Sequence, residues 1–394
     1  MRVSSSTLFN SNVSVLGQLQ TQLQQTQQQI ASTRRAMSPA EATRAMEITQ
    51  SDAMNTQYAA NRGTAIDTLS LADGNLQSVT SLLQDVRDAV VGAGGSSLNN
   101  NDRKNIAAGL SGRLQELIGL ANSEDGTGNY LFAGFQSKAQ PFVDTPAGVG
   151  YFGDDGQHNV QASATQQIAS SDSGADVFMR VKNGNGAFAT QAAPANTGSG
   201  VVSAGSVSNP VLLTGNNYSV SFSVVGGVTT YGVTNTTTNA VVSAGNPYVS
   251  GQAISFDGLQ FDIQGAPANG DAFTVSPSAN ESMFKTISDL VNALNTPVVG
   301  ANLTNSLKRG LNQLDNALNN IGTIRASVGS RLNEIDALQS AGTDMGLQFK
   351  KILSGLQDVD YTKAISDMTQ QQMSLQAAQQ SFAKIANLSL FNYL

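Results

Sequence analysis

Residues 358–394 read DVDYTKAISDMTQQQMSLQAAQQSFAKIANLSLFNYL, and this stretch decides the fold. One set of its residues is separated by alternating steps of four and three, the spacing that keeps one side of a helix against a partner helix. The set is Tyr361, Ile365, Met368, Gln372, Leu375, Gln379, Phe382 and Ala386. The stretch therefore predicts a terminal helix with a coiled-coil seam along one face.

The amino-terminal stretch carries the same alternation and predicts a first helix from Asn12 to Met37. Its seam residues are Leu16, Leu19, Leu23, Thr26, Ile30, Thr33 and Met37. Two helices of about 25 residues would each be about 38 Å long at 1.5 Å per residue. Because the two seams match in spacing and length, we expect the two ends of the chain to pair with each other.

A second helix is predicted to begin at Ser38-Pro39-Ala40-Glu41, a capping box with Ser as N-cap, Pro at the first helical position and Glu at the third. The helix would end at Gly92. In its later part, steps of three and four residues place a set of apolar side chains on one face of the helix. They are Leu76, Val79, Leu83, Val86 and Val90. We expect this helix to be one side of a rod.

Three further helices complete the predicted helical part of the chain. A helix over 102–122 carries one apolar face, and a short one runs from Met283 to Asn295. The longest pattern follows, in which mostly apolar residues recur every three or four positions over some fifty residues. They are Leu307, Leu311, Leu314, Leu318, Ile321, Ile324, Val328, Leu332, Ile335, Leu338, Gly342, Met345, Phe349, Ile352 and Leu356. A helix of that length cannot bury its stripe alone, so it should lie along the 38–92 helix.

The segment from Gln140 to Ser278 predicts an inserted β domain. It is rich in Gly, Thr, Ser, Asn and Val, and Gly226-Gly227 and Asp257-Gly258 stand where tight hairpin turns are expected. The shorter stretch from Asn129 to Phe135 is also predicted to be a strand or hairpin. From Asn183 to Phe256 there is no charged residue, which indicates a surface of hydroxyl and amide groups rather than a catalytic cleft.

Composition excludes several classes of function. Only 12% of the 394 residues are charged, the net charge is -7, and no cluster of Lys and Arg exists, so neither nucleic acid nor an anionic membrane surface is expected as a partner. There is no cysteine and a single histidine, so thiolate catalysis and multi-histidine metal sites are not expected. No apolar run approaches the roughly 18 residues of a membrane span, and the first residues lack the pattern of a cleaved signal.

Three motifs resemble catalytic or binding chemistry but have plainer explanations. Gly148 to Gly153 matches a dinucleotide-binding pattern, yet no βαβ unit surrounds it, so we interpret it as a Gly-rich turn. Adjacent Asp154 and Asp155 should point apart and act as surface carboxylates. His158 has no partner in the sequence for a metal site or a catalytic base. No enzyme, cofactor or metal is therefore predicted.

The chain as a whole resembles the flagellin superfamily of bacterial flagella, and within it the family of hook-filament junction proteins, the third hook-associated proteins. The resemblance rests on paired terminal helices, an inserted β domain, absence of Cys and Trp, and six motifs. These are MRVSSSTLF at 1–9, YLFAG at 130–134, GDAFTV at 270–275, VGSRLN at 328–333, DVDY at 358–361 and SLFNYL at 389–394. One departure is MSPAE at 37–41, which has fewer acidic residues than is usual at that loop.

The resemblance implies a mainly α fold with an inserted all-β domain, in which both chain ends form a long helical bundle or coiled coil. The expected domains are a terminal assembly domain of 1–37 and 360–394, a helical rod of 38–139 and 279–359, and a β domain of 140–278. It also implies a structural adaptor that joins the first hook-associated protein to flagellin. It would form a ring with its own copies and be secreted to the extracellular flagellum by the export apparatus, with a cytoplasmic export chaperone.

Two other functions stay open from the sequence, namely a filament-forming flagellin and a surface adhesin that displays the β domain. For the adaptor, the side chains expected at the assembly interface are the apolar residues of the two terminal seams and of the last seven positions. They are Leu16, Leu19, Leu23, Ile30, Ile365, Met368, Leu375, Phe382, Leu388, Leu390, Phe391 and Leu394. The last four form a dense apolar cluster at a chain end that would otherwise fray.

Overall fold

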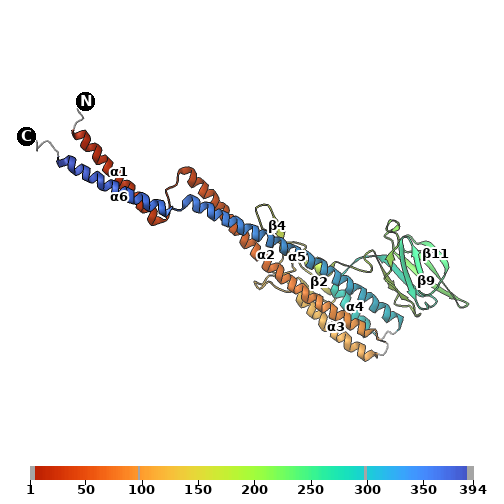
Figure 1. Cartoon of the computed structure of the whole chain (residues 1–394). Coiled ribbons are helices and arrows are strands. Elements are labelled where there is room, and N and C mark those ends of the chain that lie inside the picture. The colour runs from red at the N-terminus through yellow and green to blue at the C-terminus, as the bar shows by residue number, and fades with distance from the viewer. Residues whose placement is uncertain (1–4, 96–97, 297–299, 388–394) are drawn as a thin grey trace, which may run out of the picture. The chain divides into compact units, whose positions relative to one another are not determined.

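The computed structural model describes residues 5–95, 98–296 and 300–387. Its long helices occupy both ends of the chain and flank an all-β segment (Figure 1). The helices are α1 Ser5–Ser32, α2 Pro39–Ala93, α3 Asn100–Ala121, α4 Met283–Asn295, α5 Ala301–Gln357 and α6 Tyr361–Asn387, with short turns η1 Ala175–Met179 and η2 Pro210–Leu212. The mainly α fold with an inserted β domain is confirmed.

Fifteen short strands lie between α3 and α4 in the described part of the chain, and every pairing between them is antiparallel. They are β1 Phe142–Thr145, β2 Gly148–Tyr151, β3 Asn159–Gln161, β4 Gln167–Ala169, β5 Val181–Lys182, β6 Phe188–Ala192, β7 Val201–Val202, β8 Ser206–Val207, β9 Tyr218–Val225, β10 Val228–Asn235, β11 Ala240–Pro247, β12 Ala253–Phe256, β13 Leu259–Gln264, β14 Ala272–Pro277 and β15 Asn280–Glu281.

The chain divides into two compact units. One contains residues 1–60 and 338–394, and the other contains residues 61–337. The first unit holds α1, α6 and the ends of α2 and α5 nearest to them. The second holds the rest of α2 and α5, together with α3, α4 and the strands.

The second unit has a helical core in which four helices meet. Leu76, Val79 and Leu83 of α2 share one buried cluster with Leu314 and Ile321 of α5, as their spacing predicts. Ion pairs cross between the same two helices, from Arg87 to Asp315 at 2.8 Å and from Arg325 to Asp73 at 2.9 Å. The cluster also includes α3 and α4, so the long stripes of α2 and α5 are buried together in this unit.

The β domain is a two-layered antiparallel structure with its own core. One sheet has the order β11-β10-β9-β14-β6, and the other has the order β12-β13-β7, with β8 also paired to β13. Residues that alternate along the strands, such as Tyr218, Val220 and Phe222, are buried between the layers. The predicted hairpin turns are confirmed, because Val225 pairs with Val228 and Phe256 with Leu259.

Three predictions about local structure are wrong. The first helix ends at Ser32 rather than at Met37, because Thr33 takes a left-handed backbone with φ of 59°. The stretch from Asn129 to Phe135 forms turns and one isolated bridge from Tyr130 to Glu124, and its Leu131 and Phe132 side chains are buried in the helical core. The Gly-rich segment after residue 147 is strand β2, which pairs with β1.

Candidate assembly surface of the terminal helices

The two terminal helices lie side by side, as the sequence predicts (Figure 1). On α1 the less exposed side chains that are described recur at the predicted spacing at Asn12, Leu16, Leu19, Leu23, Thr26 and Ile30, and Gln29 beside Ile30 is partly buried as well. Thr26 is the most buried of them, at 9% exposure, and its hydroxyl donates to the Gln22 carbonyl at 3.0 Å. The seam of α1 is confirmed as far as Ile30, whereas Thr33 and Met37 lie beyond the helix and are exposed.

The seam of α6 differs from its prediction at every second position. The less exposed residues are Ala364, Met368, Gln371, Leu375, Ala378 and Phe382. Met368, Leu375 and Phe382 therefore lie where expected, but Ala364, Gln371 and Ala378 replace Ile365, Gln372 and Gln379. Both sets keep the alternating spacing, and the observed one includes the small side chains of Ala364 and Ala378.

Several large side chains of the two terminal helices are exposed, among them Tyr361 and Ile365 of the predicted seam. Tyr361 is 46% exposed, Ile365 49% and Met373 60%. Val13 and Val15 of α1 are similarly exposed, at 47% and 45%. The apolar surface of the helix pair is thus only partly covered within one subunit.

The remaining predicted interface residues fall into two groups. Leu16, Leu19, Leu23 and Ile30 are half-buried along the pair, so part of each side chain stays accessible. Leu388, Leu390, Phe391 and Leu394 lie outside the described residues.

A short backbone crossing joins the linkers that follow α1 and precede α6. Val359 donates its N–H to the Thr33 carbonyl at 3.1 Å, and Arg35 donates its N–H to the Gln357 carbonyl at 2.9 Å. The Arg35 side chain also donates from Nε to the Leu356 carbonyl at 2.9 Å. Both linkers are therefore fixed to each other at the level where the terminal pair begins.

The predicted capping box at the start of α2 is confirmed. Glu41 accepts from the Ser38 N–H at 2.8 Å and from the Ser38 hydroxyl at 3.0 Å, while the Glu41 N–H donates back to that hydroxyl at 3.3 Å. Arg35 adds an ion pair to Glu41 at 2.6 Å. One carboxylate thus connects the linker crossing to the first turn of α2.

Glu41 is expected to titrate below its ordinary range. The hydrogen bond from the Ser38 backbone, followed by those from Arg35 and the Ser38 hydroxyl, lowers the pKa of Glu41. Because the pKa is lower in the folded state, the ionised carboxylate stabilises the folded protein at pH values above the ordinary pKa of about 4.3. This stabilisation is lost as the pH falls through the folded-state pKa. The NMR titration of Glu41 should have a lower midpoint in the folded protein than in urea.

Arg35→Met is the matched variant for this titration, because it removes one donor and keeps the Ser38 bonds. Its Glu41 midpoint should rise part of the way towards the unfolded value. Equal midpoints in folded and unfolded protein would show that the capping box does not hold the carboxylate.

The motifs that resemble chemistry have structural partners. Asp154 accepts from the N–H groups of Phe135 and Gly156, each at 2.8 Å, and Asp155 pairs with Arg180 at 2.6 Å. The Nε2 of His158 lies 3.1 Å from the Gly134 carbonyl oxygen.

Within residues 5–95, 98–296 and 300–387, no three His, Cys, Asp or Glu side chains could hold a metal ion together. No helix of that described part is long and apolar enough to cross a membrane.

Three segments of the chain match described families. Residues 3–137 match the bacterial flagellin N-terminal helical region, and residues 311–394 match the bacterial flagellin C-terminal helical region. Residues 192–277, within the β domain, match the D2-like domain of flagellar hook-associated protein 1.

Solved structures decide the family. The chain is 30% identical to flagellar hook-associated protein 3 from Legionella pneumophila, with a TM-score of 0.74 over 79% of this chain and 98% of that one. FlgL from Xanthomonas campestris is 32% identical, with a TM-score of 0.72 over 78% and 99% of the two chains. This chain belongs to the flagellar hook-associated protein 3 family.

The similarity to this family covers nearly the whole chain. Flagellar hook-associated protein 3 of Salmonella typhimurium is 27% identical over 406 residues, and the match covers 99% of each chain. Within this family fold, the terminal helix pair is the candidate functional site, since its described large apolar side chains are covered only in part by the subunit itself.

Proposed function

We propose that the chain is a structural adaptor of the bacterial flagellum, located at the junction between the hook and the filament. The observation that carries the proposal is the partly covered terminal helix pair of a hook-associated protein 3 family member. A related structure is described as the flagellar junction protein FlgL from Legionella pneumophila. An adaptor needs surfaces that remain open until neighbouring subunits cover them.

Neighbouring subunits would bury what the helix pair leaves exposed. Among the α6 residues whose exposure is described, only Ala364 is buried, at 6%. Covering a side chain such as Ile365 or Met373 contributes about 1.5 to 3 kcal/mol when burial is complete. We assign these outward residues, together with the accessible parts of Leu16, Leu19, Leu23, Ile30, Met368, Leu375 and Phe382, to contacts between subunits. Leu388, Leu390, Phe391 and Leu394 are assigned to the same contacts from their sequence alone.

The proposed neighbours are three kinds of protein with related ends. Copies of the same chain would form a ring, with the first hook-associated protein on the hook side and flagellin on the filament side. The similarity of both helical ends to flagellin, and of residues 192–277 to a domain of hook-associated protein 1, supports these partners. We further propose that the chain is secreted to the extracellular flagellum by the export apparatus, with the help of a cytoplasmic chaperone.

Copy number in purified flagella tests this function against filament-forming flagellin. An adaptor confined to one ring is expected at a small, constant number of copies per flagellum, independent of filament length. Quantitative mass spectrometry of flagella sorted by length would measure it. A copy number that rises in proportion to length would assign the chain to the filament instead.

The terminal helices are expected to become protease-resistant only on assembly. A helix pair with so little burial is marginal in water, so ordering it should be coupled to contacts with neighbours. Limited proteolysis of dilute monomer should remove residues 1–37 well before it cuts α3 or α5. Equal resistance of the amino terminus and the central helices would contradict this coupling.

A further inference from the structure

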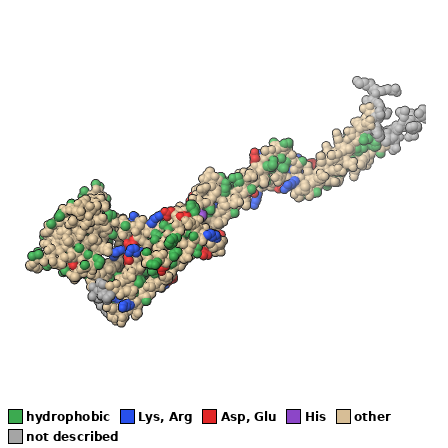
Figure 2. Space-filling model, turned by 180° about the vertical axis from the view of Figure 1, so that it is seen from behind, with side chains coloured by type: hydrophobic (Ala, Val, Ile, Leu, Met, Phe, Trp, Pro, Cys, Tyr) green, Lys and Arg blue, Asp and Glu red, His purple; other side chains and the backbone are tan. Residues whose placement is uncertain are grey.

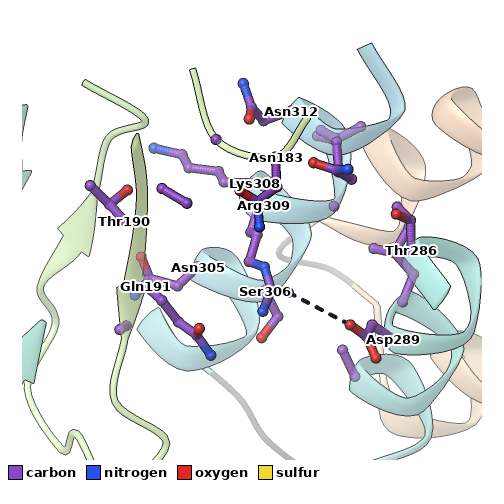
Figure 3. Close-up of a pocket in the computed structure, with 18 of the residues that line it drawn as sticks. Asn183, Thr190, Gln191, Thr286, Asp289, Asn305, Ser306, Lys308, Arg309 and Asn312 are labelled. Atoms are coloured by element: carbon purple, nitrogen blue, oxygen red, sulfur yellow. Dashed lines mark ion pairs between the residues drawn. The ribbon is translucent and has the colours of Figure 1, made fainter. Parts of the chain in front are cut away.

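A cleft lies between the β domain and the helices of the second unit (Figure 3). Its volume is about 940 Å³, within the range of ligand-binding pockets. One wall is β6 with the residues that follow it, and the other is formed by α4 and the first turns of α5. Neither the seams of the helices nor the adaptor function accounts for it.

The two walls of the cleft are connected by hydrogen bonds. Asn305 of α5 accepts from the Val202 N–H at 3.0 Å and donates to the Gly200 carbonyl at 3.0 Å. Asn302, one turn earlier, donates to the Asn196 carbonyl at 2.8 Å. Asn305 is only 8% exposed, so this connection is buried within the folded protein.

The strand that lines the cleft is the last one in its sheet. β6 pairs with β14, and it has no other strand partner among the described residues. Ala193 donates its N–H to the Ala272 carbonyl at 3.0 Å, towards β14. Since N–H groups alternate in direction along a strand, those of Ala192 and Thr190 point away from β14, where an added strand would bind.

On the helical wall, one cationic side chain is paired with carboxylates, and two other hydrogen-bond donors have no acceptor among the described residues. Arg309 is paired with Glu281 at 3.3 Å and with Asp289 at 3.7 Å. Lys308 forms no ion pair with any residue that the structure describes, and Figure 3 shows its side chain extending from α5 towards the strand that carries Thr190. Gln313 is 4% exposed, and its Nε2 has no acceptor among the described residues.

The cleft therefore combines an open strand edge with unpaired donors. We propose that it binds an extended peptide segment with acidic side chains, which adds as a strand to β6 and places a carboxylate beside Lys308. The cleft-lining residues include no aromatic side chain, so a sugar ring or a nucleobase would have no surface on which to stack. Backbone pairing and one charge pair suit a peptide better than either of those ligands.

Fluorescence anisotropy with the full chain tests this site. The probe is a fluorescein-labelled eight-residue peptide that alternates valine and glutamate, and its comparison has lysine in place of glutamate. We expect the acidic peptide to bind at least tenfold more tightly than the lysine peptide. Lys308→Glu should weaken its binding at least tenfold, since it reverses the exposed charge in the cleft.

Two further variants separate this site from general charge effects. Ala192→Pro removes an outward N–H without removing a bond to β14, so it should also weaken binding while the thermal unfolding temperature stays close to that of the parent. Lys351→Glu makes the same charge change at an exposed position outside the cleft and should leave binding unchanged. Equal binding of both peptides, or binding unaffected by Lys308→Glu and Ala192→Pro, would overturn the proposal. Competition by an oligogalacturonate that is insensitive to Ala192→Pro would assign the cleft to an acidic sugar and also overturn it.

Discussion

Leu314→Ala is expected to lower the free energy of unfolding by about 2 to 5 kcal/mol. Leu314 is 1% exposed and lies in the cluster that joins α5 to Leu76, Val79 and Leu83 of α2. Truncating it removes buried methyl groups and leaves a cavity that a close-packed helical core cannot fully close. Urea unfolding followed by the helical circular dichroism signal would measure the loss.

Leu71→Ala is the matched control for that core substitution, because Leu71 lies on α2 in the same unit but is 44% exposed. An exposed position of this kind should change the free energy of unfolding by less than about 0.5 kcal/mol. If Leu314→Ala unfolds at the same urea concentration as the parent, α5 does not depend on this contact with α2.

Deletion of Ser389 to Leu394 is expected to abolish incorporation at the junction while the rest of the chain still folds. The last seven residues include Leu388, Leu390, Phe391 and Leu394, which forfeit on the order of 1.5 to 3 kcal/mol each if they stay in water. The terminal pair leaves α6 half-exposed, so one subunit offers little surface to cover them. Cells with the truncated chain should release flagellin into the medium and carry hooks without filaments.

A full-length variant distinguishes the effect of removing the apolar side chains from the effect of shortening the chain. Replacing the four apolar residues with Gln keeps 394 positions and should cause the same loss of filaments. In both variants the urea unfolding of the second unit should match that of the parent, which distinguishes failed assembly from failed folding. Normal filaments on cells that make only the deletion variant would show that the tail is not an assembly contact.

The helices were predictable because their apolar spacing is long and their ends carry clear signals. α4 occupies Met283–Asn295 as predicted, and the capping box at Ser38 starts α2. Such signals are local, since they depend on residues within one or two turns of each other. The buried stripe of α5 follows its predicted spacing over most of its length, although Met345 is 50% exposed.

The register of α6 was not predictable from apolar spacing alone. Ile365 is more apolar than its neighbour Ala364, so the apolar spacing favoured Ile365 for the seam. In the structure Ala364 is buried at 6% exposure, whereas Ile365 is 49% exposed. Gln371 lies in the seam as well and continues the spacing from Ala364 and Met368. Its Oε1 is buried without a donor among the described residues, which is consistent with a weakly held pair.

The cleft beside β6 also had no signal in the sequence. The stretch from Asn183 to Phe256 is free of charge, and the visible face of the β domain in Figure 2 shows almost no charged side chains. The charges of the cleft come instead from α2, β15, α4 and α5, elements that lie outside this stretch of the chain. Sheet order and helix packing bring these residues together, and neither is encoded in a local pattern.

Imaging of labelled protein on isolated flagella tests the central claim most directly. A gold label attached through a cysteine that replaces the exposed Ser223 of the β domain would mark the chain without touching the terminal helices. The adaptor account predicts a single labelled band between the hook and the filament on every flagellum. Label distributed along the filament, or absent from the junction, would contradict it.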